Sequence, residues 1–368
     1  MPRMPLAPRM PPTFHPLRIA DRREETADAV SLAFAVPEPL RATFAFRPGQ
    51  YLTLRTTIAG QDLRRPYSIC SAPDDGELRV AIRRVPGGAF SPHATTALHP
   101  GDTIDVLPPQ GRFGHTPDPA ANALYLAIAA GSGITPILSI LAATLAGEPH
   151  SRAILLYGSR RTADILFRGA LEDLKDRHMH RLTVLHTLSR EAQDIAALSG
   201  RLDPARLRAL LPGLTDPAAI DQAFLCGPEA MLDSLPATLA ELGLPPARIQ
   251  TERFTPSAQA RPLAHPAVPP AAAATATATA TIIHDGARHT VPIAAGETVL
   301  DAALRAGLDL PWSCHAGMCS TCRARVTEGA VRMDANFSLE PWELAAGYVL
   351  TCQAHPTTPT LLADYDQV

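Results

Sequence analysis

Four of the six cysteines follow a spacing that few folds can accommodate. Three of them form a C-x4-C-x2-C array within LPWSCHAGMCSTCR (residues 310–323), and the fourth follows after 29 intervening residues. Thiolates from one tight loop and one distant segment suit a small iron–sulfur cluster, and this spacing is that of plant-type [2Fe–2S] sites. Gly317 allows the loop backbone to fold closely around an inorganic core, with amide N–H groups directed at the sulfurs. We therefore predict a [2Fe–2S] cluster whose metal ligands are Cys314, Cys319, Cys322 and Cys352.

Other cysteine chemistries fit this spacing less well. Structural zinc usually takes two short C-x2-4-C or H-x3-5-H clips, and here the second clip is missing. A c-type haem site needs C-x-x-C-H, whereas Arg323 follows Cys322. A Rieske site needs two histidines at matching offsets, but His315 lies directly beside Cys314, so we expect it to be a solvent-facing loop residue. Nothing in the sequence supports the oxidising compartment that disulfides need.

Length and composition indicate a soluble, cytoplasmic protein of several domains. At roughly 150 residues per domain, 368 residues correspond to two or three domains, and 46% apolar residues can form real cores. The net charge of −3 gives no electrostatic case for nucleic acid or anionic membrane. Residues 1–13 are Pro-rich and lack the apolar region of a secretory signal. The uncharged stretch 124–147 is interrupted by glycines and Pro136, so we expect strand, turn and helix rather than a membrane span.

The region 14–115 is predicted to be an antiparallel β-barrel. Its short apolar segments are separated by turn sequences such as Pro48-Gly49 and Pro86-Gly87-Gly88, with no long helical pattern between most of them. Six antiparallel strands of this kind argue for a closed barrel. The expected strands cover residues 17–21, 29–36, 51–58, 65–71, 78–85 and 103–107.

Two stretches of the predicted barrel have the residue types of a flavin-nucleotide site. Arg65, Tyr67 and Ser68 offer a planar fork for a pyrophosphate, an aromatic face for a flat ring and a small donor. The stretch Gly87-Gly88-Ala89-Phe90-Ser91 could cradle a phosphate with its backbone N–H groups. Each pattern alone is weak, because an isolated Arg-x-Tyr-Ser is an ordinary strand end in most proteins.

The region 116–255 alternates strand and helix patterns, which indicates an α/β nucleotide-binding domain. A strand at 124–129 leads into Gly131-Ser132-Gly133, and a helix at 137–145 follows, with Thr135 as its expected N-cap. A glycine turn at a helix N-terminus binds pyrophosphate through free N–H groups. The G-x-G-x-x-G fingerprint is incomplete because Pro136 replaces the third glycine, so a plain tight turn remains the alternative. Later elements are expected at 166–175, 182–186, 204–211 and 223–225.

Two further points of this domain are candidate nucleotide contacts. A strand at 153–157 ends at Ser159, Arg160 and Arg161, where a basic residue accommodates the 2′-phosphate of NADP. We therefore expect NADPH, with a solvated basic loop as the alternative. Cys226, Gly227 and Pro228 open another helix at a strand's carboxyl end, where open α/β sheets bind ligands. Cys226 could also be a simple buried thiol.

The last third of the chain is predicted to hold a linker and an α+β cluster domain. Residues 256–275 are rich in Pro and Ala without periodicity, which is typical of a semi-extended linker. Residues 276–368 contain the cysteine array between strand and helix patterns. Those elements are a hairpin at 276–284 and 288–293, helices at 298–306 and 341–346, and strands at 323–328 and 348–351.

These motifs occur in the order of the ferredoxin–NADP reductase superfamily, which the chain resembles, followed by a plant-type ferredoxin module. The resemblance is strongest to the reductase subunits of phenylacetyl-CoA 1,2-epoxidase complexes. It implies a β-barrel flavin domain, a Rossmann-like α/β nucleotide domain and a β-grasp ferredoxin domain. The stretches that carry it are FAFRPGQYLTL (44–54), LRRPYSIC (63–70), YLAIAAGSGITP (125–136) and FSLEPWELAAGYVLTCQAHP (337–356).

The resemblance also implies roles for the candidate residues. FAD would be held by Arg65, Tyr67, Ser68 and residues 88–91, including Gly88, Phe90 and Ser91. The nicotinamide dinucleotide would be held by residues 131–135 and 226–228. Ser68 near the flavin N5 and Cys226 near the nicotinamide are the expected catalytic residues. Glu252 and Phe254 lie where the superfamily closes its nucleotide domain on the flavin.

The expected activity is electron transfer from NADPH through FAD and the [2Fe–2S] cluster to the oxygenase subunits of a phenylacetyl-CoA epoxidase. A nicotinamide gives two electrons as a hydride, a cluster takes one at a time, and a flavin bridges the two. The sequence lacks the paired Glu-x-x-His motifs of a di-iron oxygenase, so the acceptor is expected to be another protein. Two alternatives remain: a reductase for another acceptor, such as a hybrid-cluster protein or a ring-hydroxylating oxygenase, and a ferredoxin-type carrier without flavin activity.

Overall fold

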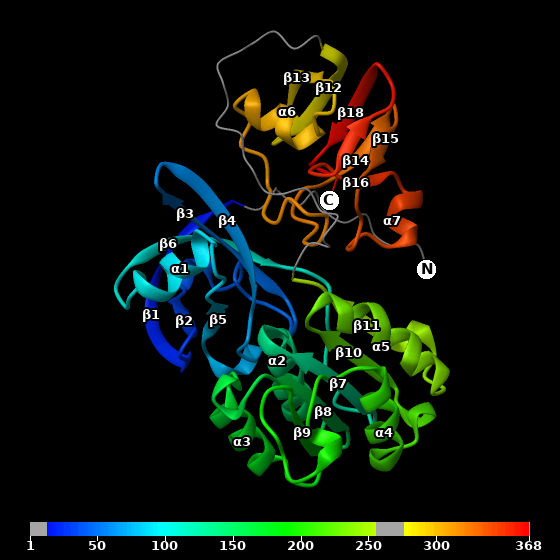
Figure 1. Cartoon of the computed structure of the whole chain (residues 1–368). Helices are drawn as coiled ribbons and strands as arrows, with labels where there is room; N and C mark the ends of the chain where they lie inside the picture. Colours follow the sequence, from blue (N-terminus) through cyan, green and yellow to red (C-terminus); the bar gives the residue numbers. More distant parts are fainter. Residues whose placement is uncertain (1–12, 255–275, 368) are drawn as a thin grey trace. The chain divides into compact units, whose positions relative to one another are not determined.

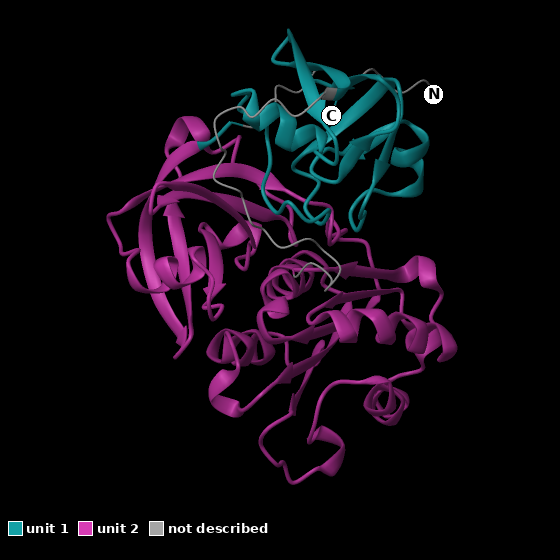
Figure 2. Ribbon diagram, turned by 45° about the horizontal axis from the view of Figure 1, so that its top comes forward, with its two compact units in different colours: residues 1–14, 256–368 teal, residues 15–255 magenta. Residues whose placement is uncertain are grey.

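The computed structural model describes residues 13–254 and 276–367 (Figure 1). The chain divides into two compact units, one formed by His15–Thr255 and one that holds the C-terminal residues 276–367 (Figure 2). The predicted linker at 256–275 lies outside the described residues. Within the described part, no helix combines the length and the apolar composition needed to cross a membrane.

The first half of the larger unit is the predicted antiparallel barrel. Its six-stranded sheet has the order β4-β3-β6-β1-β2-β5. A bridge between Ile69, directly after β4, and Val80 on β5 joins the two ends of this sheet. Leu17, Ile19 and Leu54 are among the apolar side chains that fill its interior. The strands are β1 (His15–Thr26), β2 (Ala29–Ala35), β3 (Tyr51–Ile58), β4 (Gln61–Ser68), β5 (Leu78–Arg83) and β6 (Thr103–Gln110).

A short helix, α1 (Phe90–Thr96), follows the glycine turn of the barrel and was not expected from the sequence. Phe90 and Ala94 face the barrel core and anchor the helix there. The preceding glycines and Pro92 resemble a turn, so the helix is decided by this packing rather than by local propensity.

The second half of the larger unit is a parallel sheet with helices on both faces. Its strands have the order β11-β10-β7-β8-β9, and every neighbouring pair is parallel. Ile137, Leu171 and Phe224 belong to one apolar core, whereas Leu207 and Leu235 belong to a second one. Because both faces are covered, the strands are almost continuously apolar. The strands are β7 (Leu124–Ala130), β8 (Arg152–Ser159), β9 (Leu182–Leu188), β10 (Gln222–Cys226) and β11 (Ile249–Glu252), and the helices are α2 (Ile134–Gly147), α3 (Arg168–Arg177), α4 (Pro204–Leu214) and α5 (Glu229–Glu241).

The prediction that Thr135 caps α2 is wrong. The helix begins at Ile134, directly after the 3-10 turn η3 (Gly131–Gly133), so Thr135 lies inside its first turn. Gly133 already has helical dihedral angles, φ −62° and ψ −8°. The Thr135 hydroxyl donates a hydrogen bond of 3.0 Å back to the Ser132 carbonyl instead of capping a free N–H group.

The C-terminal unit is an α+β fold around a five-stranded sheet of order β13-β12-β18-β14-β16. Along β12, Ala278, Ala280 and Ile282 are buried while the intervening threonines point outward or are partly exposed, so the Thr-Ala repeat is a strand with one buried face. The sheet strands are β12 (Ala276–His284), β13 (Ala287–Ala294), β14 (Arg323–Glu328), β16 (Tyr348–Leu350) and β18 (Thr360–Asp364). A separate pair, β15 (Val331–Met333) and β17 (Ala354–Pro356), and the helices α6 (Val299–Arg305) and α7 (Pro341–Ala345) complete this unit.

Candidate cofactor and electron-transfer site

The four predicted ligand cysteines lie together in the C-terminal unit, and all four are buried. The Cys314 and Cys319 thiols are hydrogen-bond partners, and so are those of Cys322 and Cys352. Within residues 13–254 and 276–367, no three Cys, His, Asp or Glu side chains surround a single metal position. Two adjacent thiol pairs suit a two-iron cluster, because each iron takes two protein ligands.

The loop backbone around these thiols is shaped to receive an inorganic core. The amide N–H groups of Ala316 and Met318 both donate to Cys314 Sγ at 3.4 Å. Gly317 has φ +74°, and a Cβ atom there would lie 2.9 Å from the Ala335 carbonyl oxygen. This close backbone approach requires glycine, and the donor set and the amides fit a [2Fe–2S] cluster.

The expectation that His315 faces solvent is wrong. Its side chain is only 10% exposed, and Nδ1 lies 3.9 Å from Asp301 Oδ1. The ring packs edge-on against Trp312 with centroids 4.3 Å apart. A positive φ of 52° at His315 turns the side chain back toward the domain, which sequence spacing alone does not reveal.

Gln353 is a contact of the cluster loop that was not among the predicted site residues. Its Nε2 donates to the carbonyl oxygens of His315 and Cys352 at 3.0 and 2.9 Å, and lies 3.5 Å from Cys352 Sγ. The side chain therefore joins the loop that holds three ligands to the strand end that holds the fourth. The only sequence signal is its position directly after a ligand cysteine.

The predicted flavin residues gather at the end of β4 and at the turn after β5. The Tyr67 ring lies 5.7 Å from the Phe90 ring. Gly88 N donates to the Val85 carbonyl at 3.0 Å, and the Ser91 hydroxyl accepts from Val85 N at 3.0 Å. Phe90 is 2% exposed, so its ring belongs to the barrel core and does not face a ligand. Arg65 Nη1 bonds to the Arg64 carbonyl at 2.7 Å.

Two glycine turns, far apart in the sequence, meet at the carboxyl end of the parallel sheet. A Cβ atom on Gly133 would lie 2.1 Å from the Cys226 carbonyl oxygen and 2.8 Å from Gly227 N. Only glycine permits this approach of the turn after β7 to the turn after β10. Tyr157 supports the first turn, because its hydroxyl donates to the Gly131 carbonyl at 3.1 Å. Pro228 follows as the N-cap residue of α5.

Ser68, Cys226 and Glu252 form a polar group between the barrel and the parallel sheet. Ser68 Oγ donates to Glu252 Oε2 at 3.3 Å. Cys226 and Glu252 are paired across the neighbouring strands β10 and β11. Desolvation raises the pKa of Glu252 to about 8, and burial followed by the Glu252 charge raises the pKa of Cys226. Below about pH 8 this site therefore holds a proton on the Glu252 carboxyl.

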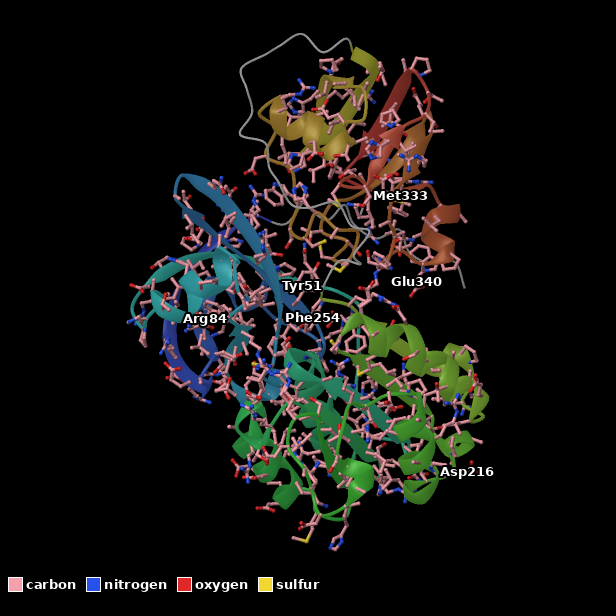
Figure 3. The ribbon with its side chains drawn as sticks, in the orientation of Figure 1. Tyr51, Arg84, Asp216, Phe254, Met333 and Glu340 are labelled. Carbon is pink, nitrogen blue, oxygen red and sulfur yellow. The ribbon has the colours of Figure 1, made fainter. Side chains whose placement is uncertain are left out.

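Phe254 follows this group two residues after β11 and is 37% exposed (Figure 3). Its exposed fraction leaves the ring accessible to a ligand or a partner domain. The resemblance places this aromatic side chain near the flavin, and that role stays a prediction.

The predicted 2′-phosphate residues lie at the end of β8. Ser159 is buried, whereas Arg161 is exposed. Arg160 contacts two carboxylates, with Nη2 3.2 Å from Asp28 Oδ2 and Nε 3.5 Å from Asp164 Oδ2. Asp28 was not among the predicted contacts, and it belongs to the turn between β1 and β2 of the barrel. No sequence signal links it to Arg160, because 132 positions separate the two residues.

Three family descriptions match consecutive parts of the chain. Residues 16–115 match the oxidoreductase FAD-binding domain, and residues 127–236 match the oxidoreductase NAD-binding domain. Residues 282–357 match the 2Fe-2S iron-sulfur cluster binding domain. The chain is thus an oxidoreductase built for FAD, a nicotinamide dinucleotide and a [2Fe–2S] cluster.

Relatives align with this chain over almost their whole length. A component of the 1,2-phenylacetyl-CoA epoxidase of Escherichia coli K12 is 45% identical over 356 residues, 96% of this chain and 98% of that protein. The ferredoxin reductase component of the 3-ketosteroid-9-alpha-monooxygenase of Rhodococcus rhodochrous is 36% identical, over 93% of this chain and 94% of that protein. Phthalate dioxygenase reductase, solved as a modular structure for electron transfer from pyridine nucleotides to [2Fe–2S], shares the fold with 21% identity and a TM-score of 0.52, over 95% of this chain and 98% of that one. The chain therefore belongs to the ferredoxin–NADP reductase superfamily, in the family of reductases with a C-terminal [2Fe–2S] domain that includes this component of the 1,2-phenylacetyl-CoA epoxidase.

Proposed function

We propose that this protein carries electrons from NADPH, through FAD and a [2Fe–2S] cluster, to the oxygenase subunits of a phenylacetyl-CoA epoxidase in the cytoplasm. The observation that carries the proposal is the 45% identity, over 96% of the chain, to the epoxidase component of Escherichia coli. Such a reductase needs sites for a hydride donor, a flavin and a one-electron carrier, and the three matched domains supply them.

At the flavin site, the barrel residues would bind FAD and orient its ring system. The fork of Arg65 is suited to the pyrophosphate, and Tyr67 offers a flat face to a ring system. Ser68 presents a hydroxyl whose hydrogen bond to Glu252 fixes its direction. FAD, when bound, supplies the chemistry that takes a hydride and releases single electrons. The Glu252 carboxyl holds a proton beside this hydroxyl at neutral pH, because its pKa is raised to about 8.

At the nucleotide site, the two glycine turns and the end of β8 would each contact a different part of the nicotinamide dinucleotide. Residues 131–135 would offer N–H groups to the pyrophosphate, and residues 226–228 would contact the nicotinamide end. Arg160 and Arg161 would contact the 2′-phosphate that distinguishes NADPH from NADH. The buried Cys226 thiol stays protonated at neutral pH, since burial raises its pKa, and so presents no negative charge to a nicotinamide.

At the cluster, the chain supplies four thiolates and an enclosing loop. The cluster, when bound, supplies one-electron transfer between flavin and partner. The amides of Ala316 and Met318 donate to Cys314 Sγ, which stabilises negative charge on sulfur. The Gln353 amide fixes the Cys352 strand end against the loop.

A second candidate is a reductase of the same architecture for another oxygenase. The 36% identity to the 3-ketosteroid-9-alpha-monooxygenase reductase component supports it, because that relative is also covered almost completely. The chemistry inside the chain would be unchanged, and only the acceptor would differ.

Reconstitution with purified oxygenases tests the acceptor. The full chain, loaded with FAD and cluster, is mixed with NADPH and with either a phenylacetyl-CoA epoxidase oxygenase or a 3-ketosteroid oxygenase. We expect NADPH oxidation coupled to epoxide formation only with the first. If the bound flavin is reduced rapidly but NADPH oxidation is coupled only to turnover by the 3-ketosteroid oxygenase, the proposed acceptor is wrong. The electron path from NADPH through FAD to the cluster would still hold.

A further inference from the structure

A network of two arginines and two aspartates lies beside the proposed nucleotide site. Asp28 accepts from Arg83 Nε at 2.9 Å and from Arg160 Nη2 at 3.2 Å. Asp164 lies 3.5 Å from Arg160 Nε and 3.9 Å from Arg83 Nη2. Asp28 and Arg83 come from the barrel, whereas Arg160 and Asp164 come from the nucleotide domain. The two positive and two negative charges of the network therefore balance, and one of the negative charges, Asp28, comes from a distant part of the sequence.

The network engages one edge of the Arg160 guanidinium. Nε faces Asp164 and Nη2 faces Asp28, and these two nitrogens form one of the two edges of a guanidinium that can bind a phosphate in bidentate fashion. The Arg160 side chain is 45% exposed, so a phosphate can reach it, and at this edge it competes with the two carboxylates. The Asp28 side chain is 35% exposed. Burial acts to raise its pKa, but the hydrogen bonds from Arg83 and Thr26 and the nearby arginine charges together hold the pKa below its ordinary value, so Asp28 is charged at neutral pH.

Arg83 fixes Asp28 in its place. Its guanidinium is 19% exposed and lies 3.7 Å from the position of a Cβ atom on Gly131, so it faces the glycine turn. The Thr26 hydroxyl also donates to Asp28 Oδ1, at 2.9 Å. These bonds hold the carboxylate toward Arg160. Because the Asp28 side chain is already ordered, its contact with Arg160 costs little further conformational entropy.

From this geometry we propose that Asp28, a residue of the flavin barrel, limits how strongly the protein prefers NADPH over NADH by competing with the 2′-phosphate for Arg160. The inference rests on the proposed placement of the adenosine ribose at the end of β8. A 2′-phosphate that binds Arg160 at this edge must displace the Asp28 contact, and at either edge the approaching charge is repelled by the same carboxylate. An NADH ribose lacks the phosphate and meets neither cost. Asp28 is thus a specificity-determining residue supplied by the other domain.

Binding of two small probes isolates the effect. The probes are 2′,5′-ADP and 5′-AMP, which differ only in the 2′-phosphate, titrated calorimetrically into the full chain loaded with FAD and cluster. The substitution Asp28→Asn keeps the side-chain shape and an acceptor for Thr26, removes the charge, and replaces the Oδ2 acceptor of Arg83 and Arg160 by an NH2 donor. We expect the dissociation constant for 2′,5′-ADP to fall about two- to five-fold, the scale of one partly exposed ion pair, with that for 5′-AMP unchanged.

Arg160→Ala and the double variant show whether Asp28 acts through Arg160. If it does, Asp28→Asn has no effect on 2′,5′-ADP binding once Arg160 is alanine. Glu24→Gln is the matched control, because it removes one charge from β1, the strand that leads into the Asp28 turn, and there Glu24 pairs with Arg22 instead. It should leave the binding of both probes unchanged.

Several results would overturn the proposal. Unchanged or weaker 2′,5′-ADP binding in Asp28→Asn would show that the carboxylate does not compete with phosphate. If Asp28→Asn still tightens 2′,5′-ADP binding when Arg160 is alanine, Asp28 acts only through long-range charge repulsion and not through Arg160. If Asp28→Asn does not fold, Asp28→Ala removes the same carboxylate, and a failure to tighten 2′,5′-ADP binding there has the same meaning. Because only probe binding is measured, these results are independent of which oxygenase accepts the electrons.

Discussion

The hydroxyl of Ser68 lies 3.3 Å from Oε2 of Glu252, although 184 positions separate the two residues. Ser68 ends the barrel strand β4, and Glu252 ends β11, the edge strand of the parallel sheet. The bond therefore joins the two halves of the larger unit at the place proposed for the flavin and the nicotinamide. It also sets a carboxyl of raised pKa next to a hydroxyl, and perturbed pKa values of this kind cluster at functional sites.

Glu252→Gln should change how stability depends on pH. Desolvation raises the folded-state pKa of Glu252 to about 8 from the ordinary value of 4.5. Between these values the folded state binds more protons than the unfolded state, so the Glu252 contribution to stability falls as pH rises through this window. Glutamine cannot ionise, so the variant lacks this loss of stability. The melting temperature of the variant minus that of the parent should therefore increase by several degrees from pH 5 to pH 8, at roughly 2–4 °C per kcal/mol.

Thermal unfolding across that pH range measures this gain. Glu241→Gln, at the exposed end of α5, is the control and should show a constant difference from the parent. A constant difference for Glu252→Gln as well would mean that Glu252 titrates as an ordinary surface carboxyl.

Cys319→Ser should remove the cluster and leave the flavin in place. The substituted thiol belongs to one of the two cysteine pairs of the C-terminal unit, and the barrel belongs to the other unit. We expect loss of the iron–sulfur absorbance and of the reduced-state EPR signal, with FAD still bound and reducible by NADPH. Cys70→Ser, at a buried thiol of the barrel, should keep the EPR signal. An intact signal in Cys319→Ser would remove this residue from the ligand set.

Arg160→Ala should raise KM for NADPH by about three- to ten-fold and leave KM for NADH nearly constant. A charge-assisted bond to phosphate contributes roughly 1.5–3 kcal/mol, but Arg160 must first give up its contacts to Asp28 and Asp164. Steady-state kinetics with both nucleotides and a dye acceptor measures the difference. Arg168→Ala, at an exposed arginine paired with Glu172 on α3, is the control. Equal effects of Arg160→Ala on both nucleotides would exclude a role in reading the phosphate.

Gly133→Ala should destabilise the nucleotide domain by about 2–4 kcal/mol, more than ordinary overpacking, because the methyl group meets backbone atoms. Its Cβ atom would lie 2.1 Å from the Cys226 carbonyl oxygen. Gly169→Ala is the matched control, since nothing lies within 4 Å of its Cβ position in α3 and the change should stabilise by about 0.4–1 kcal/mol. Denaturant unfolding of both variants gives the comparison, and equal stabilities would contradict the observed contact between the two glycine turns.

The local features of this protein could be predicted from its sequence. The strands expected at 51–58, 276–284 and 323–328 have the same bounds in β3, β12 and β14. The cysteine spacing predicted a cluster loop, and the structure brings those four thiols together in two pairs. These features follow from neighbouring residues: alternating apolar side chains specify a strand face, and ligand spacing within a loop limits its shape.

The contacts between distant segments depend on the tertiary fold. The central strand β18 was not predicted, because its five residues gain their partners from β12 and β14. The helix α1 depends on packing of Phe90 into the barrel, and the burial of His315 depends on a positive φ and on the Trp312 ring. The Asp28–Arg160 contact adds a second carboxylate to an arginine whose only nearby acidic residue in the sequence is Asp164. The charge and the secondary-structure propensity of each side chain follow from the sequence. The partner that neutralises, buries or orients a side chain depends on which distant segments the fold brings within a few ångströms of it.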